Sequence, residues 1–210
     1  MKTKFHIEIT RDVLNQYFNQ DVPKNIIRSN ILQDRLKNQF GHDYIHFDSN
    51  AFIEGFEYIS QQEKSLYQSL SAGDLEQAWK SLGRILHSWQ DFYSHSNYVH
   101  IWLKKTENPD PQKINHADPE IMRSPVLQSG KNYGIIEFIA LIPGVSLFVK
   151  PFMPPDSHAK MNLDSPKSGS AFKYAYSAAK KRTDDVIGQV LHHINGMETG
   201  EEKLRTFLGK

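Results

Sequence analysis

Cysteine is absent from this sequence of 210 residues. Without it there can be no disulfide and no thiolate metal ligand, so any zinc site has to use histidine, aspartate and glutamate. An excess of one charge is also lacking, because 25 Lys and Arg face 24 Asp and Glu. A chain without a general basic field is not expected to have a stable nucleic-acid partner. The apolar content of 39% is that of an ordinary globular protein.

Long apolar runs are lacking too. Charges occur throughout the first dozen residues, so we predict no secretory signal, and a location that is cytoplasmic or reached by signal-independent export. The most apolar stretch is Ile135–Pro155, but its charge-free part, Phe138–Val149, is interrupted by Pro143–Gly144 and is too short to span a bilayer. Two interpretations stay open: a buried hairpin of short helices, or a hydrophobic flap that touches lipid or shapes a substrate entrance.

Helical periodicity dominates the rest of the chain. Apolar residues recur at three- and four-residue intervals, whereas the polar, proline-containing stretch Lys105–Lys131 is expected to be a loop. The length suits one hydrophobic core. We therefore predict a single all-α domain over residues 1–210. The expected helices cover residues 3–19, 23–40, from a cap at Asp48 or Ser49 to Leu70, 74–104 and 168–194.

Three residues of the expected helix 74–104 combine metal-ligand chemistry with helical spacing. His87, Asp91 and His95 follow one another at intervals of four residues, so they share one face of the helix. Imidazole nitrogen and carboxylate oxygen are zinc ligands. Because His87 and His95 are about 12 Å apart along the axis, neighbouring ions suit this strip better than one ion. The alternative is a solvated polar face, since the apolar residues of this helix lie almost opposite.

Other histidines and acids are weaker candidates when taken one at a time. Asp34 would by default be a surface charge on the second helix, and Asp48 is explained equally well as a helix cap. Asp164 could likewise serve only as the cap of the last helix. His116 and Glu120 have four-residue spacing and form a minor alternative source of ligands.

Taken together, five blocks of sequence resemble the zinc-dependent phospholipase C/P1 nuclease superfamily, and most closely its branch related to the heterokaryon-incompatibility protein HET-C. The most specific block is LGRILHSWQDFYSHSN. The blocks span nearly the whole chain in the family order: His6–Thr10, Asn30–Asp34, His46–Asp48, Leu82–Asn97 and His158–Pro166.

The resemblance implies a helical domain of that type, with a cluster of two to three Zn²⁺ ions. The implied metal ligands are His6, Asp34, His46, His87, Asp91, His95, His158 and Asp164. Asp34 would also orient the attacking water and is thus the implied catalytic residue. For the last ligands, His116 and Glu120 remain the alternative. In the phospholipase C branch the terminal amine is a ligand, but here His6 lies five residues inside the chain, which disfavours that role for Met1.

The implied activity is hydrolysis of a phosphodiester by a metal-activated hydroxide. Phospholipid is the favoured substrate, with transient contact to a membrane surface, because the apolar stretch immediately precedes His158. Two alternatives stay open. A P1-type single-strand nuclease would stack bases on Tyr93, Tyr98 and Trp102. A non-catalytic interaction or incompatibility-type module would use zinc only to hold its helices together.

Overall fold

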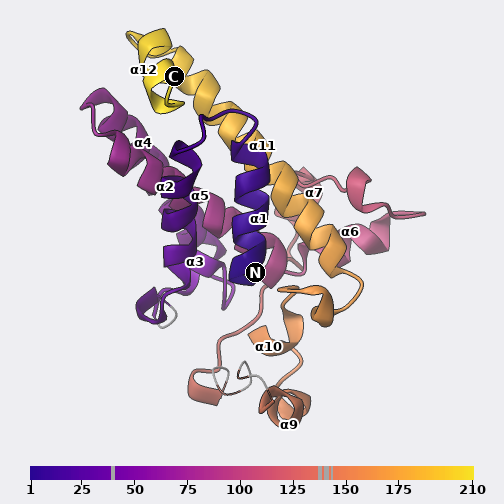
Figure 1. Cartoon of the computed structure of the whole chain (residues 1–210). Helices are drawn as coiled ribbons and strands as arrows, with labels where there is room; N and C mark the ends of the chain where they lie inside the picture. Colours follow the sequence, from indigo (N-terminus) through magenta and orange to yellow (C-terminus); the bar gives the residue numbers. More distant parts are fainter. Residues whose placement is uncertain (39–40, 137–138, 140–141, 143) are drawn as a thin grey trace.

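A computed structural model describes residues 1–38, 41–136, 139, 142 and 144–210. Within these ranges the chain is mostly helical and forms no β-strand, which confirms the predicted all-α class (Figure 1). The α-helices are α1 (Thr3–Leu14), α2 (Val22–Ile31), α3 (Asp43–His46), α4 (Phe52–Ser71), α5 (Leu75–His95), α6 (Tyr98–Lys105), α7 (Pro119–Met122), α9 (Ser146–Val149), α10 (His158–Met161), α11 (Phe172–Asn195) and α12 (Gly200–Phe207). The 3₁₀ turns are η1 (Leu32–Asp34), η2 (Leu36–Asn38), η3 (Pro111–Lys113), η4 (Lys150–Phe152) and η5 (Pro166–Ser168).

Helix α5 lies at the centre of the fold and packs against α2, α4 and α11. The carboxylate of Asp74 caps its start by accepting a hydrogen bond from the backbone N–H of Gln77 at 3.0 Å. Gly83 allows α2 to approach closely, since a Cβ at this position would lie 2.4 Å from the carbonyl oxygen of Ile26. This close approach places η1, which directly follows α2, beside the C-terminal half of α5.

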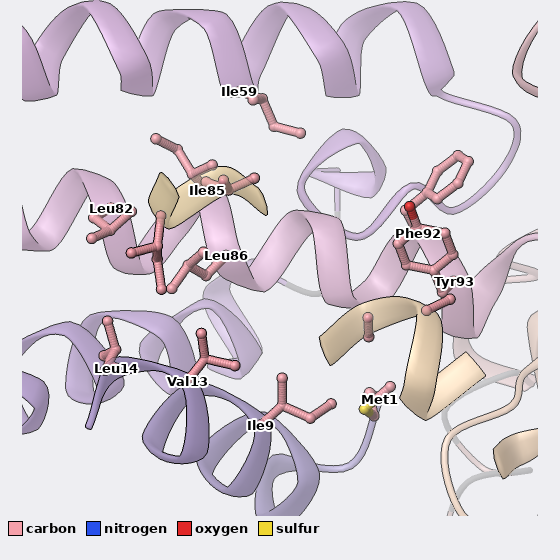
Figure 2. Packing of buried hydrophobic residues seen from close by; sticks show 14 of the residues in the cluster. Met1, Ile9, Val13, Leu14, Ile59, Leu82, Ile85, Leu86, Phe92 and Tyr93 are labelled. Carbon is pink, nitrogen blue, oxygen red and sulfur yellow. The ribbon is translucent and has the colours of Figure 1, made fainter. Parts of the chain in front are cut away.

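The hydrophobic core fills the space between α5 and the helices around it. Figure 2 shows Ile9 and Val13 of α1 on the side of α5 that carries Leu86. Burying a large aliphatic side chain contributes about 1.5–3 kcal/mol, so the helices have a source of stability that is independent of any metal. The fully buried apolar side chains include Ile9, Leu14, Ile26, Leu66, Leu82, Ile85, Leu86 and Phe92.

Several helix ends differ from the predicted ones. The first helix ends at Leu14, and the second ends at Ile31 and continues as η1. The central helix predicted over 74–104 is two helices, α5 and α6, because the backbone of Ser96 is extended and its hydroxyl donates to the carbonyl of Phe92 at 2.6 Å. Helix α12 lies beyond the predicted helices.

The described residues of the range 135–152, which we call the apolar segment, lie at one end of the molecule around α9 (Figure 1). The interpretation of Ile135–Pro155 as a buried hairpin is wrong for most of the described large side chains, which are exposed, although Met153 is buried against Ala159. Pro143, where that hairpin was expected to turn, lies outside the described residues. No helix in the described ranges is both long and apolar enough to cross a membrane. The exposed large side chains of the segment are Ile135, Ile136, Ile142, Val145, Phe148 and Phe152.

Candidate metal centre

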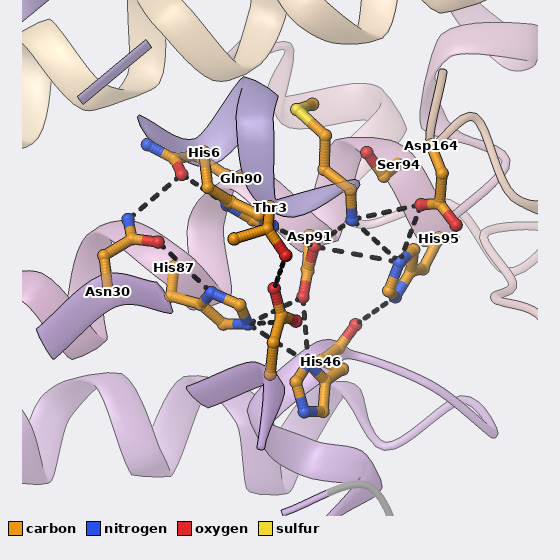
Figure 3. Close-up of polar contacts among 12 residues, drawn as sticks. Thr3, His6, Asn30, His46, His87, Gln90, Asp91, Ser94, His95 and Asp164 are labelled. Carbon is orange, nitrogen blue, oxygen red and sulfur yellow. Dashed lines mark hydrogen bonds and ion pairs between the residues drawn. The ribbon is translucent and has the colours of Figure 1, made fainter. Parts of the chain in front are cut away.

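Nine histidine and aspartate side chains converge around the C-terminal half of α5, and we call them the His/Asp cluster. Figure 3 shows six of them, His6, His46, His87, Asp91, His95 and Asp164. They come from parts of the chain that are far apart in sequence, so the fold and not local spacing assembles them. The cluster consists of His6 from α1, Asp34 from η1, His46 from α3, Asp48 shortly after α3, His87, Asp91 and His95 from α5, His158 from α10, and Asp164 shortly after α10.

Asp91 lies at the centre of this cluster. Its Oδ2 is 2.9 Å from both His87 Nε2 and His46 Nδ1. Its Oδ1 is 3.1 Å from His6 Nε2 and 3.7 Å from His95 Nε2. The Asp91 side chain is only 1% exposed. A carboxylate that is removed from water in this way is stable only beside compensating positive charge or hydrogen-bond donors.

Asp48, His95 and His158 form a second group of donors. Asp48 Oδ1 is 2.7 Å from His158 Nδ1 and 3.2 Å from His95 Nδ1. Ligand atoms of these three residues lie within 4.8 Å of one another. The same limit holds for a separate group, His6, Asp34, His87 and Asp91. Each group has the three or four donors that one zinc ion takes from a protein.

Backbone turns hold these side chains beside α5. Directly after α3, Phe47 has a φ of 56° and reverses the chain. Gly130 then joins three segments: its N–H donates to the carbonyl of His95 at 3.0 Å, and its carbonyl accepts from the N–H of Ser49 at 2.8 Å. A Cβ on Gly130 would lie 2.5 Å from the Cα of His158. A residue without a side chain is therefore needed where the segments meet.

Amide side chains orient two of the histidines. Gln90 Oε1 lies 2.6 Å from His6 Nδ1, and Asn30 Oδ1 lies 3.3 Å from His87 Nδ1. The amide nitrogen of Gln90 donates in turn to the hydroxyls of two buried threonines. When Nδ1 donates to an amide oxygen, Nε2 carries the lone pair and is available as a ligand atom. Both Nε2 atoms face the centre of the cluster.

Asp34 and Asp164 form the accessible edge of the cluster. Their side chains are 23% and 17% exposed, whereas that of His87 is fully buried. Asp34 Oδ2 accepts a hydrogen bond from Thr3 Oγ1 at 3.2 Å, and its Oδ1 is 3.7 Å from His87 Nε2. Solvent therefore contacts the cluster on the side of these two carboxylates.

The amine of Met1 also lies within the cluster. It forms an ion pair with Asp91 and another with Asp164 at 3.0 Å, and it is 3.1 Å from His95 Nε2. Burial lowers the pKa of this amine, but the carboxylates of Asp164, Asp91 and Asp34 outweigh that effect and raise the pKa to about 11. The amine is thus a cation that partly balances the buried carboxylates.

Burial and neighbouring charges shift the pKa values of the cluster in opposite directions. Burial lowers the pKa of His87 to about 4, although Asp91 opposes this, so the ring is neutral at neutral pH. At His95, burial and the Met1 amine also lower the pKa, but Asp48 and Asp91 hold it well above its ordinary value. Burial raises the pKa of Asp91, yet the amine and His95 keep it well below its ordinary value. Ionised carboxylates and a neutral imidazole are the forms that bind a divalent cation.

The donor set fits a divalent metal ion. Within the described structure, His6 Nε2 and His46 Nε2 are buried and have no hydrogen-bond partner. The contact of His6 Nε2 with Asp91 at 3.1 Å lacks hydrogen-bond geometry. Unpaired buried ring nitrogens are uncommon, and each needs an explanation. A cation at the centre would satisfy His6 Nε2, whereas His46 directs its Nδ1 toward Asp91 at 2.9 Å. A set of imidazole nitrogens and carboxylate oxygens suits zinc.

Three interpretations of single residues need correction. The strip on α5 is not a solvated face, because His87 and Asp91 are buried against α1, η1 and α3. Asp34 is not a helical surface charge, because it lies in a 3₁₀ turn with its carboxylate directed toward the cluster. Asp48 does not cap α4, which begins at Phe52 without a side-chain cap. Its place in the order His-Phe-Asp was the signal for a role in the cluster.

The alternative ligands have other partners. His116 Nε2 pairs with Asp185 at 2.5 Å, and Glu120 pairs with Lys105 at 2.6 Å. Asp164 does not serve as a cap, because its carboxylate contacts His95 at 3.2 Å. The structure therefore brings together all eight residues that the resemblance implied as ligands, together with Asp48.

The aromatic residues considered as stacking surfaces are not available for that role. Tyr93 and Tyr98 are fully buried, and Trp102 is only 6% exposed. The Tyr98 hydroxyl donates to the backbone carbonyl of Asn115 at 2.8 Å. These rings belong to the core, because their apolar area is stabilised by burial while their polar atoms find backbone partners.

Comparisons with known proteins assign the chain to a family. A family model described as the VWA7 N-terminal domain matches residues 5–119. Von Willebrand factor A domain-containing protein 7 of Rattus norvegicus is 32% identical over 76 residues, and the Mus musculus protein of the same name has the same identity and length of match. Each match covers 36% of this chain and only 8% of the length of the relative. No solved structure matches. The residues matched by the family model include seven of the nine cluster residues, all except His158 and Asp164.

Proposed function

The chain belongs to the VWA7 N-terminal domain family, and we propose that it is a zinc-dependent phosphodiester hydrolase that acts on phospholipid headgroups as a phospholipase C does. The observation that carries the proposal is the His/Asp cluster, with its two groups of donors inside an otherwise apolar helical domain. Buried titratable groups with perturbed pKa values are costly to stability, and such groups concentrate at functional sites.

The cluster would hold two to three zinc ions. His6, Asp34, His87 and Asp91 form one candidate set, and Asp48, His95 and His158 form another. His46 contacts the first set through Asp91, and Asp164 contacts the second set through His95. Bound zinc would neutralise the charge of a phosphodiester and lower the pKa of water at the site.

Asp34 is the residue that we assign to orienting the attacking water and accepting its proton. Its side chain lies at the accessible edge, 23% exposed, beside the fully buried ring of His87. The Thr3 hydroxyl donates to Oδ2 at 3.2 Å and so orients the carboxylate. A base that is both oriented and accessible meets the geometric requirement for general base catalysis.

The apolar segment supports phospholipid as the substrate, reached by transient contact with a membrane surface. The chain leaves the cluster region at Lys131 and returns at His158. The two ends of this excursion are joined by hydrogen bonds from Lys131 N–H to the carbonyl of Asp156 at 2.7 Å and from His158 N–H to the carbonyl of Lys131 at 2.9 Å. An exposed apolar patch of this kind marks a surface that contacts lipid or a protein.

Zinc content and hydrolysis test this proposal. The chain, purified without chelator and without an affinity tag of histidines, is expected to contain about two to three equivalents of zinc. It is expected to hydrolyse phospholipid. The His87→Ala variant should lose zinc and activity, while the exposed His192→Ala should keep both.

Each other outcome has a distinct meaning. Bound zinc without hydrolysis of phospholipid or single-stranded nucleic acid would assign the cluster to a non-catalytic, metal-stabilised interaction module. Hydrolysis of nucleic acid alone would assign it to a nuclease. Absence of zinc after reconstitution would overturn the proposal.

A further inference from the structure

A second feature lies beside the His/Asp cluster. It is a surface cavity of about 660 Å³ lined by residues of α2, η1, η2, α3, α4 and α5. Positive side chains dominate its charged lining, although the whole chain has a net charge of only +1. The charged lining residues are Arg28, Arg35, Lys37, Glu76, Lys80 and Arg84.

Within the described ranges, most of this positive charge is not paired with a carboxylate. Glu76 pairs with Lys80 at 2.6 Å. Arg84 donates to the neutral amide of Gln62 at 3.2 Å. Among the residues that the structure describes, the three arginines of the cavity and Lys37 form no ion pair. Cations that line one concave surface without carboxylate partners create a positive potential that attracts an anion.

The cavity wall also contains a neutral phenol group. Tyr58 lies in its wall and donates to Gln33 Oε1 at 3.0 Å. Burial raises the pKa of Tyr58 to about 12, more than Arg84 lowers it, so the hydroxyl keeps its proton. Tyr58 therefore adds no negative charge to the cavity, while its proton is engaged by Gln33 and the guanidinium groups supply the donors. Guanidinium is the side-chain group best suited to bidentate binding of phosphate.

The cavity and the cluster are formed by neighbouring residues of the same chain segments. Arg35 follows Asp34 directly in the chain, and the Cα atoms of such neighbours are about 3.8 Å apart. Tyr44, another lining residue, lies in α3 two residues before His46. A ligand in the cavity therefore lies against the same short segments, η1 and α3, that present ligand atoms to the cluster.

We propose that this cavity binds an additional phosphate group carried by the substrate's headgroup, so that the domain prefers phosphorylated, anionic headgroups to zwitterionic ones. The proposal rests on the proposed function and adds the substrate class to it. A choline headgroup would bring its quaternary ammonium close to Arg28, Arg35 and Arg84, where charge repulsion disfavours it. The phosphate substituents of an inositol headgroup would instead pair with these arginines.

Binding to a soluble probe tests the cavity without any need for turnover. The probe is inositol trisphosphate, titrated by calorimetry into the zinc-loaded chain and again after removal of zinc, because phosphate can also bind the metal. The Arg35→Gln/Arg84→Gln variant is expected to bind at least about tenfold more weakly in both states. The matched control is Arg11→Gln/Arg205→Gln, which removes two exposed arginines outside the cavity lining. It is expected to bind as the parent does.

The results separate this proposal from the proposed function. Weaker binding in the cavity variant alone, with zinc content unchanged, supports the cavity even if no hydrolysis occurs. Equal binding by parent and cavity variant, or an equal loss in the control, overturns it even if the chain is a hydrolase. Tighter binding of a single-stranded oligonucleotide that depends on the same two arginines would also overturn it, because the cavity would then serve a nucleic-acid backbone.

Discussion

The His/Asp cluster and the apolar segment reverse the usual distribution of side chains. In the cluster, ionisable groups are buried: Asp91 is 1% exposed and His87 is fully buried. In the apolar segment, large hydrophobic groups face solvent: Phe148 is 77% exposed and Phe152 is 89% exposed. Charged residues are seldom fully buried unless they are paired, and contiguous apolar surface is rare on soluble proteins.

The two regions are also adjacent in structure. The excursion that carries the apolar segment begins beside Gly130 and ends at His158, and both of these residues pack together at the end of α5. Each departure from ordinary burial reduces stability or solubility when considered alone. Together they would meet the two requirements of the proposed hydrolase at a lipid surface, a polar centre and an apolar contact region. The predictions below separate the two regions experimentally.

The largest effect is expected from Asp91→Asn. The substitution keeps the shape of the side chain but removes the carboxylate that contacts four histidines and the Met1 amine. Removing one partner of a buried charge network leaves the others uncompensated and typically costs about 3–5 kcal/mol. We expect loss of zinc and of hydrolysis, and a metal-free chain whose free energy of unfolding is lower by about this amount. Metal analysis and denaturant unfolding measure the two effects.

Asp185→Asn is the matched control for this substitution. Asp185 also pairs with a histidine, His116, but its side chain is 46% exposed. Exposed ion pairs contribute little, so a change within about 0.5 kcal/mol and full zinc content are expected. A similar loss of stability in both variants would mean that Asp91 has no special place in the fold.

A smaller effect, confined to the other region, is expected from the double substitution Phe148→Ser/Phe152→Ser. Both rings are exposed, so the free energy of unfolding and the zinc content should not change. Transfer of a phenylalanine ring from water to an apolar phase contributes about 1.5–3 kcal/mol. Because two rings are removed, we expect sedimentation assays with vesicles to give an affinity at least about 100-fold lower. Unchanged vesicle binding would mean that the apolar segment does not contact lipid.

The orientation of His6 offers a finer test of the cluster. Gln90→Ala removes the oxygen that lies 2.6 Å from His6 Nδ1, while every proposed metal ligand stays in place. Partners that orient metal ligands typically contribute about 10- to 100-fold in affinity. We expect competition with a chelator to show zinc binding about tenfold weaker, at unchanged stoichiometry. An unchanged zinc affinity would mean that packing alone orients the ring.

Part of this arrangement could be predicted from the sequence, the helices from local periodicity and the cluster residues from the family resemblance. Helical periodicity predicted the all-α fold, and the resemblance placed eight residues that the structure brings together. Asp48 was missed because a carboxylate shortly before an expected helix has an adequate explanation as a cap. The exposure of the apolar segment could not be predicted either, because apolar composition alone does not distinguish a buried hairpin from a surface flap. That distinction depends on whether the core has room, which is a property of the whole fold.

The smallest expected effect distinguishes the two candidate sources of the last ligand. His158 and His116 each lie next to an aspartate, at 2.7 Å and 2.5 Å. Only His158 shares its aspartate with His95 of the cluster, through Asp48. His116→Ala should therefore leave zinc stoichiometry and hydrolysis unchanged, whereas His158→Ala should lose about one equivalent of zinc. Loss of zinc in the His116 variant would instead mean that the loop between α6 and α7 provides a ligand of the third zinc ion. The contacts of Asp48 would then be structural ion pairs.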